Sequence, residues 1–143
     1  MVWWLEMSRT SSGIATTDIG VRQVFEKSIT VAANAGATTV GTITSQACTI
    51  ESITIHADTG QTVNLTTCAV TGGTSGVIIF ISTTDATQAN LDAADKQVTW
   101  VGVVRLATND TIVITPVGTG ATALDLTIIV TYYSSSADGG TIV

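Results

Sequence analysis

The sequence has little charge. Only 11% of its 143 residues are Asp, Glu, Lys or Arg, against roughly 25% in typical soluble domains. The five basic residues are not clustered, and the formal net charge is −6. Because so few cations cannot neutralise a phosphate backbone, the composition argues against direct binding of nucleic acid.

Long hydrophobic runs are missing as well. No apolar stretch approaches the ~18 residues that a membrane-spanning helix needs, so no membrane partner is expected. Residues 1–7 (MVWWLEM) are apolar but short, lack a basic segment and contain Glu6, which makes them a poor signal peptide. Met7 is a second possible start, so residues 1–6 are either part of the natural chain or an upstream extension.

Proline and cysteine are scarce. One Pro and 13 Gly exclude collagen-like and Pro-rich disordered chains. The two cysteines, Cys48 and Cys68, are too few for a disulfide scaffold. We expect both to be reduced residues in or near the core of a protein made in a cytoplasm; a disulfide between them is the alternative.

β-branched residues are abundant: Val, Ile and Thr supply 59 of the 143 residues. Their side chains are stiff at χ1 and favour strands. Alternating apolar and polar positions predict about eight strands separated by turns. Because each strand has an apolar face to cover, the sequence predicts an all-β fold: a two-sheet antiparallel β-sandwich, jelly-roll-like. An immunoglobulin-like sandwich is the second possibility.

The chain divides into three predicted segments. Residues 1–20 form an extended N-terminal arm without periodicity, residues 21–133 the sandwich domain, and residues 134–143 a polar tail in which Ile142 and Val143 are suited to docking.

Glycines and parity changes predict irregular strands. Gly41 indicates a β-bulge. The apolar positions shift from even at Ile50 to odd at Ile53, which indicates a second bulge. In the run over residues 63–69, the odd positions are expected to share a face: Val63, Leu65, Thr67 and Ala69.

Three further segments make predictions that a structure can test. Residues 77–81 (VIIFI) are apolar on both faces, which predicts a central strand covered on both sides. Pro116 predicts a strand edge, because proline cannot donate a ladder hydrogen bond. Residues 85–95 are rich in Ala and Asp and form either a short helix or a long loop.

Candidate catalytic and metal-binding groups are few. His56 is the only histidine. With Asp58 it offers two possible ligands at a strand end, whereas metal sites need three or four. Asp85, Asp92 and Asp95 are candidates for calcium or a glycosidase pair, but an EF-hand spacing is missing. We expect a solvated histidine and no catalytic, metal or cofactor site; an acidic cleft joining His56 to these carboxylates would favour a hydrolase.

Aromatic residues offer one candidate ligand platform, made of Trp100, Tyr132 and Tyr133. Trp100 and Tyr132 share the parity of the aliphatic residues in their own strands, so we expect them in the core. An exposed, coplanar set would instead favour sugar binding.

The N-terminal arm carries Trp3, Trp4 and Leu5. Burying such side chains stabilises by about 1.5–3 kcal/mol each, and leaving them in water favours aggregation. They pack either on their own sandwich or on a neighbouring chain. Since aromatic residues are enriched at interface hot spots, we take these three as candidate partner-interface residues.

The low-charge strands over residues 21–133, with residues 105–112 (RLATNDTI) followed by 124–132 (LDLTIIVTY), resemble the jelly-roll decoration, or cement, proteins of tailed-bacteriophage capsids. The resemblance implies a structural homodimer or homotrimer without catalysis or cofactor. Such a protein binds the major capsid protein on the outer surface of the virion, cements neighbouring subunits, and is made in the host cytoplasm.

The net charge of −6 suits an outward position, away from packaged DNA. The alternative function is a ligand-binding sandwich, either a carbohydrate-binding module or a host-attachment or adhesin domain. A small hydrolase is the third possibility.

Overall fold

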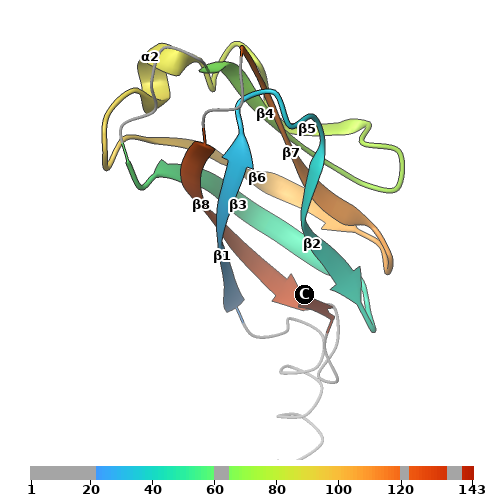
Figure 1. Cartoon of the computed structure of the whole chain (residues 1–143). Coiled ribbons are helices and arrows are strands. Elements are labelled where there is room, and N and C mark those ends of the chain that lie inside the picture. Colours follow the sequence, from blue (N-terminus) through green and yellow to red (C-terminus); the bar gives the residue numbers. More distant parts are fainter. Residues whose placement is uncertain (1–21, 60–64, 120–122, 135–139) are drawn as a thin grey trace, which may run out of the picture.

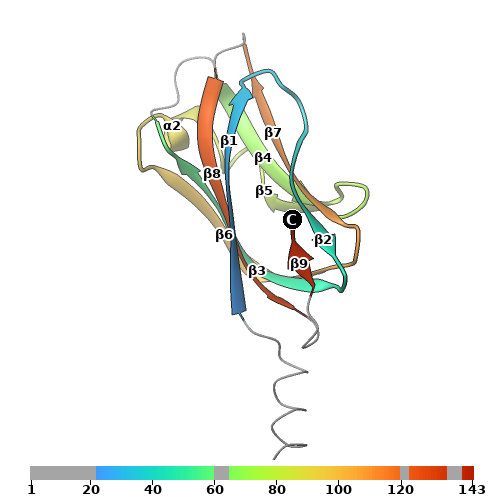
Figure 2. The same ribbon diagram turned by 60° about the horizontal axis from the view of Figure 1, so that its bottom comes forward.

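The computed structural model describes residues 22–59, 65–119, 123–134 and 140–143. Within these ranges the strands form two antiparallel sheets that face each other (Figures 1 and 2). The first sheet has the order β1-β8-β3-β6 and the second the order β5-β4-β7-β2-β9. The elements are β1 (Arg22–Ala32), β2 (Thr38–Thr44), β3 (Cys48–Ala57), β4 (Leu65–Gly72), β5 (Ile78–Ile81), α2 (Gln88–Leu91), β6 (Gln97–Leu106), β7 (Thr111–Gly118), β8 (Ala123–Ser134) and β9 (Thr141–Ile142).

The strand pairing is nested. β1 pairs with β8, β2 with β7, β3 with β6 and β4 with β5, all antiparallel. The two halves of the chain therefore run side by side like one long hairpin, which is folded over so that β3 also pairs with β8 and β4 with β7. This is the order of a jelly roll and not of an immunoglobulin-like sandwich. The predicted all-β sandwich is confirmed.

The core lies between the two sheets and is mostly aliphatic. On β8 the even positions from Leu124 to Tyr132 are buried, as the alternation predicted. At one side of the sandwich the rings of Phe80 on β5 and Trp100 on β6 meet edge to face, with centroids 4.9 Å apart. This contact closes the core where the outermost strands of the two sheets come together.

Both predicted bulges are present. The register shifts between Thr39 and Gly41 on β2, and between Ile50 and Ser52 on β3. A Cβ atom at Gly41 would lie 2.5 Å from Cγ2 of Ile142. Glycine thus leaves room for β9, which pairs with β2 and buries Ile142 beside it (Figure 2).

The prediction of a central strand at residues 77–81 was wrong. β5 is the outermost strand of the second sheet. Phe80 and Ile81 are buried, but Val77 and Ile79 are 78% and 63% exposed. The apolar residues on the outer side of this strand are therefore a surface feature, which alternation alone cannot distinguish from a buried strand.

The expected face of β4 was wrong beyond its first residue. Leu65 is buried, but the register shifts between Leu65 and Thr67. After that shift Cys68 and Val70 are buried, and Thr67 and Ala69 are only partly covered. One extra residue reverses the facing of all that follow. The expected position of Val63 lies outside the described residues.

Pro116 does not lie on an edge strand, because β7 is in the middle of the second sheet. It pairs with Cys68 of β4. The pairing of β7 with β2 extends only to Ile114, so within the described ranges Pro116 has no β2 residue opposite it. The missing N–H is tolerated there because the neighbouring strand has ended. The segment of residues 85–95 contains the four-residue helix α2 and loops on both sides.

We expect Gly102→Ala to destabilise the fold. A Cβ atom at Gly102 would overlap the six-membered ring of Trp100, and that ring is held against Phe80. Overpacking of this kind costs about 1–3 kcal/mol, measurable as a lower free energy of unfolding in urea. Val101→Ala, at an exposed neighbouring position, is the control; equal stability of both variants would contradict the close packing at Gly102.

Candidate functional site

His56 lies near the end of β3, between two carboxylates. Its Nδ1 is 3.0 Å from Oδ1 of Asp58, and its Nε2 is 3.6 Å from Oδ1 of Asp95. The side chain of Asp95 is 92% exposed. The hydroxyl group of Thr127 lies in the same cluster. It donates a hydrogen bond to Oδ2 of Asp58 over 2.8 Å and not to the imidazole of His56. A triad needs the base beside the nucleophile, so the cluster ties β3 to β8 and does not activate a hydroxyl.

The acidic residues of the segment containing α2 do not converge. Asp85 accepts a hydrogen bond from Oγ of Ser82 at 2.6 Å, and Asp92 pairs with Lys96. Among the described residues, no group of three or more His, Cys, Asp or Glu side chains could hold a metal ion. The alternatives of a calcium site or a glycosidase pair at Asp85, Asp92 and Asp95 therefore find no geometric support in that part of the chain.

The aromatic residues do not form a platform. Tyr132 is 4% exposed, and its hydroxyl donates to Oε1 of Gln23 over 2.8 Å. Trp100 packs against the core. Tyr133 points the other way, where Arg22 lies 5.6 Å from its ring centroid. The core position predicted for Tyr132 is confirmed, whereas Trp100 is only partly buried at the border of the core. The coplanar exposed set that would favour sugar binding is not formed by these three residues.

Both cysteines are free and buried, as predicted. Cys48 begins β3 of the first sheet, and Cys68 lies in β4 of the second. Burial raises the pKa of the Cys68 thiol to about 12 and also raises the pKa of Cys48. A thiol with a raised pKa is a poor nucleophile, so these residues act as small core side chains.

The arm residues Trp3, Trp4 and Leu5 lie outside the described residues. The described chain begins at Arg22, whose Nε is 2.8 Å from Oε2 of Glu51. Both side chains border an open hollow of about 580 Å³ on the outer face of the first sheet. The bulge at Glu51–Ser52 bends the sheet there, and Val101 and Val103 line the opposite side of the hollow.

Four of the seven exposed large hydrophobic residues in the described ranges lie on or next to the two outermost strands, β5 and β6; the others are Val24, Val117 and Val143. Val101 and Val103 on β6 are 78% and 80% exposed, and Val77 and Ile79 lie before and on β5. The strands meet through Phe80 and Trp100. We call residues 73–81 and 97–104 the uncharged side, because neither segment contains an ionisable residue.

No protein-family model matches the sequence, and no curated protein sequence matches it. The fold is similar to that of a chain in a phage capsid. That solved structure is the capsid asymmetric unit of cyanophage Pam1, matched with a TM-score of 0.55 and 18% identity over 80% of this chain and 86% of that chain.

Two other solved structures are matched with lower scores. A chain of the acidic stable capsid of Helicobacter pylori bacteriophage KHP30 gives a TM-score of 0.47 and 12% identity, over 87% of this chain and 94% of that one. The exo-β-1,3-galactanase of Phanerochaete chrysosporium gives 0.42 and 13%, over 80% of this chain and 26% of that one. At these identities the likeness concerns the fold alone.

The uncharged side was missed by reasoning from the sequence. The signal was present: in the run from Trp100 to Val104, valines occupy the outward positions that strands of a solvated sheet usually give to polar residues. Alternation identified the inward face of this strand correctly. It gave no information on which strand would lie at the edge of its sheet.

Among the described helices, none has the length and apolar character that a membrane span requires.

Proposed function

We propose that this chain is a structural protein of a phage virion, which binds the outer surface of the capsid and cements neighbouring major capsid subunits. The observation that carries the proposal is the jelly-roll fold that it shares with a chain of the Pam1 capsid, over most of both chains. The described surface adds support, because its His, Asp and aromatic residues are separated or tied into structural hydrogen bonds.

The physical demands of a cement protein match the properties of this chain. A clamp needs a rigid body with a large surface and several contacts, since binding two subunits at once raises affinity through effective concentration. The nested sheets supply the rigid body. The net charge of −6 favours a position away from the packaged DNA. Free, buried cysteines are compatible with synthesis in the reducing cytoplasm of a host.

The arm is proposed as the anchor on the capsid. Trp3, Trp4 and Leu5 are the apolar residues best suited to a pocket on a partner, and an extended arm is able to add a strand to the edge of a partner's sheet. Residues 6–21 separate these side chains from β1, which corresponds to a reach of up to roughly 50 Å when extended.

Binding to empty shells tests both the capsid-binding role of the chain and the anchoring role of the arm. Shells built from the major capsid protein encoded in the same genome are mixed with the full chain and sedimented. We expect saturable co-sedimentation. The variant with Trp3, Trp4 and Leu5 all changed to Ala should lose at least about 10-fold in affinity, whereas changing Ser8, Ser11 and Ser12 to Ala should not.

Two results would count against the proposal. If the shells bind none of the full chain, the cement role is wrong. If both triple variants bind equally well, the arm is not the anchor. Saturable binding to a sugar on a glycan array, without binding to shells, would favour the alternative of a ligand-binding sandwich.

A further inference from the structure

β6 is the outermost strand of the first sheet, and within the described ranges it pairs with β3 on one side only. Exposed strand edges promote pairing with other chains, and proteins usually block them with charges, proline or bulges. Residues 97–104 contain neither an ionisable residue nor a proline. β1, at the opposite edge of the same sheet, carries Arg22, Glu26 and Lys27. The sheet is thus protected by charged side chains at the β1 edge and lacks them along residues 97–104 at the β6 edge.

The register shows which backbone groups of β6 are available. The N–H of Ala57 on β3 donates to the carbonyl of Lys96 over 2.9 Å, and the pairing then runs regularly through Ile55 opposite Val98 and Ile53 opposite Trp100. Since successive residues of a strand direct their N–H and C=O groups to opposite sides, those of three residues point away from β3: Gln97, Thr99 and Val101.

A bulge limits the stretch that is suited to pairing. Between Val101 and Val104, β6 has two residues where β3 has only Glu51, so the strand bends at Gly102. Regular pairing at the outer edge is therefore restricted to Gln97–Val101. We propose that this segment pairs antiparallel with the same segment of a second copy of the chain, about a twofold axis at Thr99.

The side chains agree with this register. Thr99 would face Thr99 of the second copy, and threonine pairs are favourable across strands. Gln97 would face Val101 on the outer side of the sheet, and Val98 would face Trp100 on the inner side. The partly exposed indole of Trp100 would thereby be covered by an apolar neighbour.

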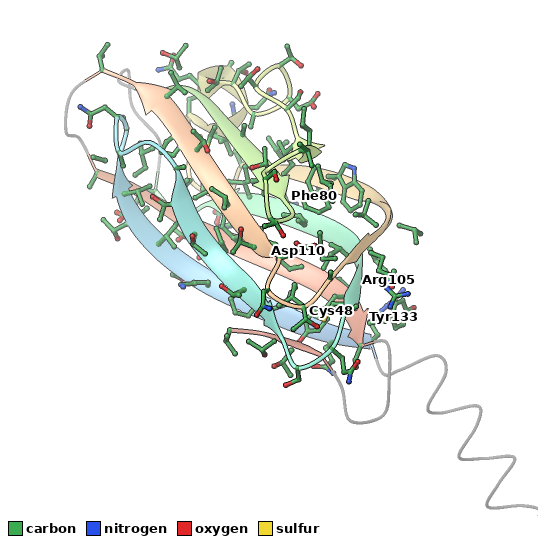
Figure 3. All side chains as sticks on the ribbon, turned by 90° about the vertical axis from the view of Figure 1, so that its right-hand side faces the viewer. Cys48, Phe80, Arg105, Asp110 and Tyr133 are labelled. Carbon is green, nitrogen blue, oxygen red and sulfur yellow. The ribbon has the colours of Figure 1, made fainter. Side chains whose placement is uncertain are left out.

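The charges that flank β6 are complementary under the same axis. At one end lie Asp92 and the 92% exposed Asp95; at the other lies the exposed Arg105, beside Tyr133 across Thr49 (Figure 3). The antiparallel arrangement turns the Arg105 end of β6 towards the end of the second copy that carries Asp95. Asp92 is already paired with Lys96 of its own chain. Asp110, at the end of the turn that follows β6, is already held by Thr74 over 2.6 Å.

The exposed residues of β5 in the second sheet also favour a second copy of the chain as the partner of β6. A twofold axis that runs through both sheets at this side also brings β5 opposite β5 of the second copy. Val77 and Ile79, 78% and 63% exposed, would then face their own counterparts. A closed, self-complementary contact of this kind is the commonest form of protein dimer.

The strand pairing is tested with a proline. Thr99→Pro removes an N–H that points away from β3, so the backbone pairing within the chain is preserved and only the side-chain hydrogen bond to Thr54 is lost, whereas pairing with a second copy is blocked. We expect the full chain to sediment at twice 14.7 kDa and the variant to dissociate at least about 100-fold more readily. Val24→Lys, at an exposed position on the opposite edge of the sheet, is the control and should still dimerise.

A cross-link tests the register independently of the proline. Directly opposite residues of paired strands have Cα atoms about 5.5 Å apart, within the range of a disulfide. In a dimer of the Thr99→Cys variant, oxidised glutathione should therefore convert the two introduced thiols to one disulfide, with release of two reduced glutathiones. The Thr39→Cys variant, changed at an exposed position of β2, should remain monomeric on a denaturing gel.

The results of these experiments distinguish pairing of β6 with a second copy from binding of another segment at this edge. A chain that stays monomeric at about 100 μM, a dimer that Thr99→Pro leaves unchanged, or cross-linking of Thr99→Cys no faster than that of Thr39→Cys would overturn the proposal. Loss of the dimer on deletion of residues 1–7 alone would identify the arm as the occupant and overturn it too. All these measurements omit shells, so their failure leaves the capsid role to be judged on shell binding.

Discussion

Ile53→Ala is expected to lower the free energy of unfolding by about 2–5 kcal/mol, which is the cost of removing three carbons from a packed core. Ile53 is completely buried, and it lies on β3, between Val130 of β8 and Trp100 of β6. Because β3 is an inner strand, neighbours on both sides limit collapse into the cavity. At this chain length the loss corresponds to a midpoint of thermal unfolding lower by roughly 5–15 °C.

Urea unfolding followed by circular dichroism measures this loss. Val24→Ala is the control, because Val24 lies in the same sheet but is 64% exposed; its change should stay within about 0.5 kcal/mol. A loss below about 1 kcal/mol for Ile53→Ala, or equal losses for both variants, would contradict the position of Ile53 in the core.

The second large effect is a loss of stability in alkali that depends on Cys68. Burial in β4 raises the pKa of this thiol from its ordinary value of 9.0 to about 12. Between these values the folded protein keeps a proton that the unfolded chain releases. The contribution is therefore complete below pH 9 and is lost as the pH rises towards 12, by up to about 1.4 kcal/mol per pH unit.

Comparison with Cys68→Ala isolates this contribution from the other groups that titrate in alkali. We expect the free energy of unfolding of the wild type, measured in urea with a reductant, to fall by about 2–3 kcal/mol more than that of the variant between about pH 9 and 11. Parallel curves for the two proteins would show that the thiol does not titrate differently on folding. Cys48, whose pKa burial also raises, is present in both and cancels.

Local patterns predicted the parts of the fold that depend on a single strand. The alternation in residues 124–132 gave the buried face of β8 without error, and the parity change between Ile50 and Ile53 gave the bulge of β3. These predictions succeeded because one side chain in two must face the core. The expected face of β4 was wrong, since a bulge near Leu65 reverses the face without leaving a sign in residues 67–70.

The candidate site was less accessible from sequence. A single histidine and few carboxylates gave the expectation that no catalytic site is present. In the described ranges His56 lies between Asp58 and Asp95, and Asp85 is held by Ser82. The closeness of Asp95 to His56 could not be foreseen. It results from the turn that joins α2 to β6, which brings residues 39 positions apart to the same end of the first sheet.

The sequence by itself determined that this chain folds as stiff strands around an aliphatic core with little ionisable chemistry, because β-branched residues and alternation act locally. Only the tertiary structure decided which strands end their sheets. The run of residues 77–81 and the valines of β6 read alike whether a strand is central or outermost. Position in a sheet depends on pairing between residues far apart in the chain, and that pairing turns an apolar segment from core into exposed surface.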